Sequence, residues 1–130
     1  MTQKIVQIAI VVKNYDEAIS FYTDKLGFVL LEDKVMSETK RWVRVAPKGD
    51  PQFSLLLAQA SGEKQEQSIG NQAGGRVFIF MHTDDLMRDY AAMKSKGVVF
   101  VREPVVEEWG KVAVFQDLYG NLFDLIEPLK

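Results

Sequence analysis

The sequence predicts an α+β domain of two tandem βαβββ modules, which form a curved eight-stranded mixed sheet around a concave pocket, with the helices on its outer face. Strand-like and helix-like segments follow one another in the same order twice. Tyr22 in the first expected helix matches Tyr90 in the second, an offset of 90 − 22 = 68 residues. The glycines that end the two helices, Gly27 and Gly97, are 97 − 27 = 70 residues apart. Such self-similarity at a near-constant offset indicates an internal duplication.

The first module occupies about residues 1–60. Val6–Val12 is rich in β-branched residues and is expected to be a strand. Asn14 is a typical helix N-cap residue, and apolar side chains recur behind it at helical spacing until Gly27. Three further strands are expected at Phe28–Leu31, Arg41–Ala46 and Phe53–Ala60.

The second module, about residues 75–130, repeats this order. Residues 61–74 are polar and aperiodic and are expected to be a linker or mobile loop. Val77–Met81 is the next expected strand, and Asp84 and Asp85 begin a helix that ends at Gly97. Strands are then expected at Val98–Val101, Val112–Phe115 and Leu122–Ile126. The segment Asp117–Asn121 predicts a tight turn, in which Gly120 and Asn121 suit positive backbone angles.

The composition excludes several classes of function. The 130 residues carry a formal net charge of −2, and the basic side chains are scattered, so neither a nucleic acid nor an anionic membrane is an expected partner. There is no cysteine, which rules out disulfides, thiolate metal sites and cysteine nucleophiles. The apolar run at the start is too short to cross a bilayer. We therefore expect a cytoplasmic protein.

Three segments carry a resemblance to a known family: DEAISFYTDKLGF (16–28), KSKGVVFVREP (94–104) and WGKVAVFQDLYGNLFDLIEP (109–128). On these the chain resembles the vicinal oxygen chelate superfamily, which includes glyoxalase I, bleomycin-resistance proteins and extradiol dioxygenases. The resemblance runs almost the full length and implies the fold. It does not select a reaction, because the superfamily spans isomerisation, ring cleavage, thiol addition and sequestration.

The resemblance also implies where a metal would bind. In metal-dependent members, four inward positions hold a divalent cation, usually through His and Glu. They map here onto Gln7, a residue near Leu55 or Leu57, Arg76 and Asp124. Arginine has no lone pair to donate and leucine has no donor atom, whereas zinc takes three or four ligands. We therefore expect no metal cofactor at this place.

Gln7 is also expected to contact a ligand. Three further polar side chains are candidates for the pocket, each with a structural alternative. Arg76 suits an oxyanion of a ligand, or else it forms an ion pair with Asp124. Asp124 lies in an otherwise apolar strand, where it is either a catalytic base or the buried ion-pair partner of Arg76. His82 is the only histidine, and it either transfers protons or binds ligand at the pocket mouth, or caps a helix.

Aromatic side chains are the other ligand-binding candidates. Trp42 and Arg44 share one face of their strand and are expected to supply an aromatic wall and a cation, or else a subunit contact. Trp109 lies in a loop where it caps the pocket or packs on the sheet edge. The expected apolar lining consists of Phe78, Phe80 and Phe115.

These observations favour a metal-free member of the superfamily that binds a small polar-aromatic molecule, either to sequester it or to catalyse a modest proton transfer. The first alternative is a divalent-metal-dependent lyase, isomerase or dioxygenase of the glyoxalase type, with Gln7, His82 and Asp124 as an unusual ligand set. The second is an interaction module that binds a peptide or protein. The resemblance further implies a homodimer.

Overall fold

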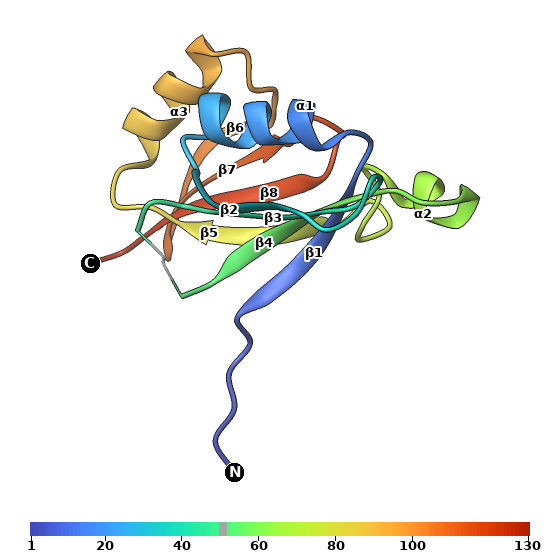
Figure 1. The fold of residues 1–130 in the computed structure, drawn as a ribbon. Coiled ribbons are helices and arrows are strands. Elements are labelled where there is room, and N and C mark those ends of the chain that lie inside the picture. Colours follow the sequence, from blue (N-terminus) through green and yellow to red (C-terminus); the bar gives the residue numbers. More distant parts are fainter. Residues whose placement is uncertain (50–51) are drawn as a thin grey trace. The chain divides into compact units, whose positions relative to one another are not determined.

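The computed structural model describes residues 1–49 and 52–130 and divides into two compact units, Met1–Ile69 and Gly70–Lys130. Each unit contains one helix-bearing, four-stranded mixed sheet, as the sequence predicts (Figure 1). The strands of each unit pair among themselves. The two βαβββ modules are thus confirmed, and each is described below by itself.

In the first unit the strand order is β1-β4-β3-β2. Strand β1 pairs with β4 in parallel, and the other neighbours are antiparallel. The helix α1 continues into a single wide turn, η1. The elements are β1 (Gln7–Val12), α1 (Tyr15–Ser20), η1 (Phe21–Lys25), β2 (Val29–Val35), β3 (Arg41–Ala46) and β4 (Ser54–Gln59).

The second unit repeats this topology in the order β5-β8-β7-β6. Strand β5 pairs with β8 in parallel, and β8 with β7 and β7 with β6 are antiparallel. The elements are β5 (Val77–His82), α3 (Leu86–Ser95), β6 (Phe100–Glu107), β7 (Gly110–Gln116) and β8 (Leu122–Pro128).

The helices begin and end where the sequence predicts. The side chain of Asn14 accepts a hydrogen bond from the backbone N–H of Glu17 at 3.0 Å, and Asp85 accepts one from Arg88 at 3.0 Å. Each side chain satisfies one of the unpaired donors of a first helical turn. Gly27 at φ 73° and Gly97 at φ 90° then reverse the chain in a conformation that favours glycine.

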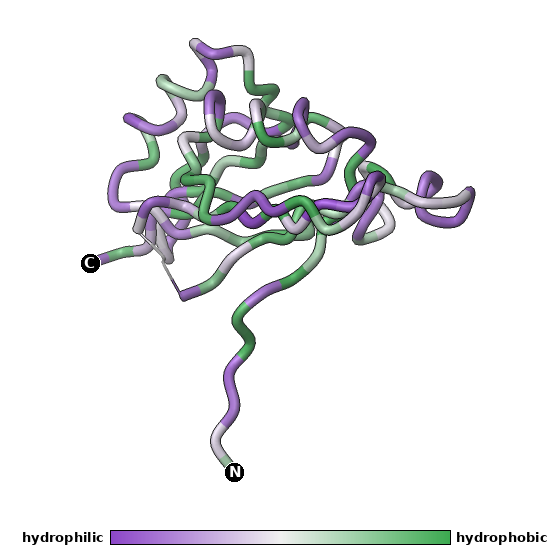
Figure 2. The backbone as a smooth tube through the Cα atoms, in the orientation of Figure 1, coloured by the Kyte–Doolittle hydropathy of each residue, from purple (hydrophilic) through white to green (hydrophobic). Residues whose placement is uncertain are grey.

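Each unit buries its apolar side chains between its helix and one face of its sheet. In the first unit Val43, Val45 and Leu57 are fully buried, and in the second Phe115 and Phe123 are. Figure 2 shows the apolar residues concentrated on the strands and the helix faces that cover them. Because successive residues of a strand point to opposite faces, the remaining face of each sheet carries the polar and partly exposed residues. That second face is where a site can form.

Two details differ from the sequence prediction. Residues 61–74 contain a short helix, α2 (Glu63–Ser68), in which the side chain of Gln65 accepts a hydrogen bond from the N–H of Ser61 at 2.8 Å. Hydrophobic periodicity could not reveal this helix, because the helix has no apolar face. Figure 2 shows α2 as mainly hydrophilic. Strands β2 and β6 are also longer than predicted. In β2, ion pairs from Asp33 and Glu32 to arginines of β3 support pairing where strand propensity is low.

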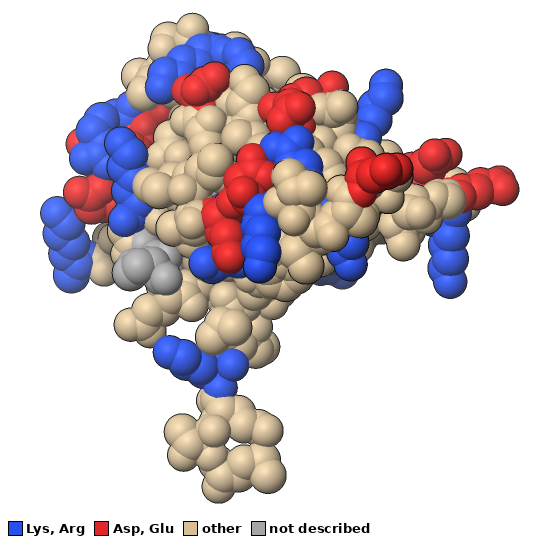
Figure 3. Space-filling view, viewed as in Figure 1, with Lys and Arg blue, Asp and Glu red and all other residues tan. Residues whose placement is uncertain are grey.

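No helix in the described part of the chain has the length and apolar character needed to cross a membrane. On the face shown in Figure 3, basic and acidic side chains are interspersed. This distribution agrees with the scattered charges in the sequence.

Candidate functional site

A chain of hydrogen bonds crosses the uncovered face of the first sheet. Gln7 Oε1 accepts a hydrogen bond from the Ser54 hydroxyl at 3.0 Å, and the Ser54 oxygen accepts one from Arg44 Nη1 at 3.3 Å. Arg44 Nε donates to Glu32 Oε1 at 2.8 Å, and Trp42 Nε1 donates to the same oxygen at 3.1 Å. The network joins all four strands, so the directions of these side chains are set by the sheet register.

Glu32 organises this network, because one carboxylate oxygen holds both the cation and the indole. The hydrogen bond from Arg44, aided by the bond from Trp42, keeps the pKa of Glu32 below its ordinary value, although partial burial opposes the shift. A carboxyl group whose folded-state pKa is lowered stabilises the fold above its unfolded pKa, and that stability is lost as the pH falls through the folded value. Trp42 is therefore held in place at neutral pH.

A pH titration of tryptophan fluorescence should report this arrangement. In a Trp109→Phe background, which leaves Trp42 as the single indole, we expect a fluorescence transition with its midpoint below 4.5, the ordinary value for glutamate. Glu32→Gln should abolish the transition, because the amide does not titrate. Glu38→Gln, a control on an exposed residue of the β2–β3 turn, should retain it. A transition that survives Glu32→Gln would contradict the assignment.

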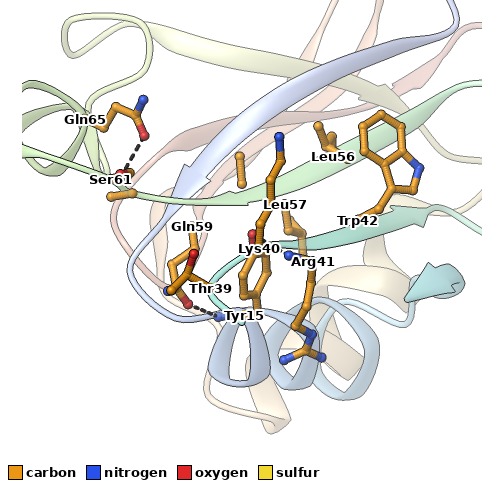
Figure 4. A pocket seen from close by; sticks show the side chains of 12 residues that line it. Tyr15, Thr39, Lys40, Arg41, Trp42, Leu56, Leu57, Gln59, Ser61 and Gln65 are labelled. Atoms are coloured by element: carbon orange, nitrogen blue, oxygen red, sulfur yellow. Dashed lines mark hydrogen bonds between the residues drawn. The ribbon is translucent and has the colours of Figure 1, made fainter. Parts of the chain in front are cut away.

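A cavity of about 510 Å³ lies within the first unit at the end of the sheet where β3 begins and β4 ends (Figure 4). It is bounded by the turn before β3, the end of β4, the start of α1 and the helix α2. Its side chains combine an aromatic wall with polar groups. The lining residues are Tyr15, Thr39, Lys40, Arg41, Trp42, Leu56, Leu57, Ala58, Gln59, Ala60, Ser61 and Gln65.

The two basic residues of the cavity differ in their partners. The guanidinium of Arg41 contacts Asp33 at 2.7 Å and Asp16 at 2.9 Å and is turned toward α1 in Figure 4. These two carboxylates raise the pKa of Arg41 and neutralise its charge. No hydrogen bond or ion pair within residues 1–49 and 52–130 involves the ammonium of Lys40. Among the described residues, Lys40 is therefore the cation of the lining that has no carboxylate in direct contact.

In the second unit, one row of residues crosses the uncovered face of the sheet. Phe80 pairs with Asp124, Asp124 with Val114, and Val114 with Arg102. Burial raises the pKa of Asp124, and the charge of Arg102 opposes that shift. Phe80 is 66% exposed. The row therefore presents a carboxylate beside an aromatic ring.

Arg76 does not form the ion pair with Asp124 that the sequence suggested as an alternative. Its exposed side chain precedes β5, its N–H donates to the Ala73 carbonyl at 3.3 Å, and the cation that acts on Asp124 is Arg102. A register shift between Val77 and Ile79 also interrupts the regular alternation of side chains at the start of β5, next to Arg76. His82 lies exposed at the end of β5.

Three aromatic candidates have different surroundings. Phe115 is fully buried, and its ring stacks on Phe123 with the ring centroids 4.9 Å apart. It belongs to the core under α3 and not to a ligand surface, which corrects the sequence prediction. Phe78 lies at the irregularity of β5 and is partly exposed, and Trp109 is 52% exposed in the turn between β6 and β7.

Several residues of the site were not found from the sequence. Glu32, Ser54, Lys40, Gln59 and Gln65 carry no motif, and they come together only through strand register and the helix α2. The alternation of Trp42 and Arg44 was the one usable signal, and it placed both on the uncovered face.

The sequence matches the Glyoxalase/Bleomycin resistance protein/Dioxygenase superfamily over residues 4–125, nearly the whole chain. The chain belongs to this superfamily. An uncharacterized protein of Shewanella frigidimarina (strain NCIMB 400) is 57% identical over 98% of this chain and 95% of its own length.

Solved structures of similar proteins agree with the fold. The crystal structure of UcmS2 superposes with a TM-score of 0.87 at 32% identity, covering 98% of this chain and 99% of the other. TnmS3, an antibiotic binding protein from Streptomyces sp. CB03234, superposes with a TM-score of 0.78 at 29% identity, covering 98% of both chains.

The residues at the metal positions of the superfamily do not fit a divalent cation. Gln7 is engaged by Ser54, Arg76 is cationic, and Asp124 is a single carboxylate. Leu55 and Leu57, near which we expected the second position, are 3% and 0% exposed and lie on the covered face. Strand alternation turns their neighbours Ser54 and Leu56 to the other face. Within residues 1–49 and 52–130 no three His, Cys, Asp or Glu side chains form a group that could hold a metal.

Proposed function

We propose that this member of the superfamily binds a small aromatic molecule with polar substituents in the cavity of its first unit, and that it does so without a metal at the usual positions. The observation that carries the proposal is the cavity itself. Its volume of about 510 Å³ falls in the range of small-molecule sites. Trp42 gives it an aromatic wall, and the network through Glu32 and Arg44 fixes the direction of that wall.

The relationship to TnmS3, described as an antibiotic binding protein, supports binding and sequestration as the function. Asp124, with its raised pKa beside Phe80, remains our candidate for a proton-transferring group if the ligand is also transformed. His82 stays a weaker candidate for the same role, and a homodimer and a cytoplasmic location stay predictions.

Thermal-shift screening with a panel of polycyclic aromatic compounds tests the proposal. A compound that binds only the folded state at 100 times its Kd stabilises it by about 2.7 kcal/mol, so the melting temperature should rise. Trp42→Leu should abolish the rise, and Trp42→Phe should keep part of it because a ring remains. A panel that shifts neither the wild type nor the variants would overturn the proposal.

Elemental analysis of untagged protein tests the metal-free part separately. We expect substoichiometric zinc, nickel, manganese and iron, and no change in ligand binding after treatment with a chelator. One equivalent of any of these metals, lost together with binding on chelation, would instead establish the metal-dependent alternative.

A further inference from the structure

We propose that the cavity of the first unit selects anionic aromatic ligands, with an aromatic carboxylate as the simplest class. This inference rests on the proposed function and names the chemistry of its ligand. The inference is drawn from the donor and acceptor atoms of the lining side chains. Some of these atoms already form hydrogen bonds within the protein, and the others are available to a ligand.

Among the described residues, the charged side chains that line the cavity are two cations, Lys40 and Arg41. The lining contains no Asp or Glu among the described residues, and of its two cations Arg41 is neutralised by Asp16 and Asp33. Lys40 has no such partner in the part of the chain that the structure describes. A negative ligand would therefore gain an ion pair without displacing one.

The position of Lys40 is fixed by its backbone. Its N–H donates to the Ser37 hydroxyl at 3.1 Å, and its carbonyl accepts hydrogen bonds from Met36 at 2.8 Å and Ser37 at 3.0 Å. The turn before β3 is thereby closed on itself. In the view of Figure 4 the side chain extends between Gln65 and Trp42, with its amine at the far end.

The two glutamines of the lining also offer donors. Gln59 Oε1 accepts the N–H of Tyr15 at 3.4 Å, and Gln65 Oε1 accepts the N–H of Ser61 at 2.8 Å. Because a backbone N–H can only donate, each amide must turn its oxygen toward it and keep its NH2 for another partner. No hydrogen bond between described residues uses either NH2 group.

The aromatic residues complete the pattern. The indole N–H of Trp42 donates a hydrogen bond to Glu32, so Trp42 offers a ligand the face of its ring. Tyr15 accepts the N–H of Arg41 at 3.1 Å through its hydroxyl oxygen, which leaves the phenolic hydrogen to donate. The lining therefore combines a ring surface with an excess of donors over acceptors. A planar ring with a carboxylate matches both features.

Binding of three naphthalene probes that differ in charge tests the inference: 2-naphthoate, its neutral isostere 2-naphthamide, and cationic 2-naphthylmethylammonium. Fluorescence titration of the Trp109→Phe protein should rank 2-naphthoate first. Lys40→Met, which keeps the apolar stem but removes the charge, should weaken 2-naphthoate at least about fivefold and leave 2-naphthamide unchanged. Lys40→Glu should reverse the preference toward the cation. Lys48→Met, an exposed lysine outside the lining, is the matched control and should change nothing.

The outcomes separate this inference from the proposed function. Equal binding of 2-naphthoate and 2-naphthamide, or insensitivity of 2-naphthoate to Lys40→Met, would overturn the anionic selectivity while small-molecule binding stands. Absence of binding by all three probes at millimolar concentration would overturn the selectivity as well, and the wider panel would then decide the proposed function. Far-UV circular dichroism of each variant verifies that it is folded.

Discussion

Gly70→Ala is expected to destabilise the protein by about 3 kcal/mol or more, because both backbone conformation and space exclude a side chain there. Gly70 has φ +74°, and a Cβ atom at this residue would lie 2.0 Å from the carbonyl oxygen of Tyr119. That oxygen belongs to the Asp117–Asn121 turn, whose own hydrogen bonds prevent it from moving aside. Urea denaturation followed by circular dichroism measures the change in the free energy of unfolding.

Gly74→Ala is the matched control for this substitution. Gly74 also has a positive φ, +64°, but a Cβ atom added there would meet no atom within 4 Å beyond its own chain neighbours. It should lose only the conformational advantage of glycine, about 1–2 kcal/mol. If the two variants were equally stable, the close approach of residue 70 to the turn would be refuted.

The sequence was sufficient to predict the elements and their duplication, because these depend on local signals. The N-cap side chains of Asn14 and Asp85 and the glycines Gly27 and Gly97 act within a few residues of themselves. Alternation along β3 likewise predicted that Trp42 and Arg44 share one face, and in the structure both donate to Glu32. Val43 and Val45, on the opposite face, are fully buried. Such patterns can be recognised without knowing which strands are neighbours.

The candidate site was predicted less well because it depends on register. Phe115 was expected to line the pocket, but its pairing with Phe123 puts it in the core. Arg76 was considered as a partner of Asp124, but the cation that acts on Asp124 is Arg102. In the sequence Lys40 is one of the scattered basic side chains, with nothing to distinguish it from the others. Lys40 matters because Asp16 and Asp33, which are distant in the sequence, contact Arg41 and do not contact Lys40. No local sequence pattern indicates which of the two neighbouring cations these carboxylates contact.

Asp117→Ala is expected to cost about 3–5 kcal/mol of unfolding free energy, through the loss of charge-assisted hydrogen bonds and the burial of unsatisfied donors. Asp117 is 3% exposed, and its Oδ1 accepts the backbone N–H groups of Tyr119 at 3.0 Å, Gly120 at 3.0 Å and Asn121 at 2.9 Å. The sequence correctly predicted a tight turn here, with Gly120 at φ +104°.

The role of Asn121 differs from the prediction and sharpens the test. It has no positive φ, and its side chain instead joins the turn to residue 72: Nδ2 donates to Asp117 Oδ2 at 2.9 Å, and Oδ1 accepts the N–H of Gln72 at 3.2 Å. Asp117→Asn should therefore be intermediate in stability, because one oxygen still accepts the backbone N–H groups while two amide NH2 groups now face each other.

Asp24→Ala provides the control for these two variants, since Asp24 is exposed and accepts a hydrogen bond from the Ser20 hydroxyl at 3.1 Å. It should change the unfolding free energy by no more than about 0.5 kcal/mol. The expected order of stability, measured by urea denaturation, is wild type and Asp24→Ala together, then Asp117→Asn, then Asp117→Ala. An Asp117→Ala protein as stable as the Asp24→Ala control would contradict this prediction. It would mean that water or other groups of the chain replace the hydrogen bonds of the buried carboxylate. The turn would then be stabilised by its glycine and its strand pairing alone.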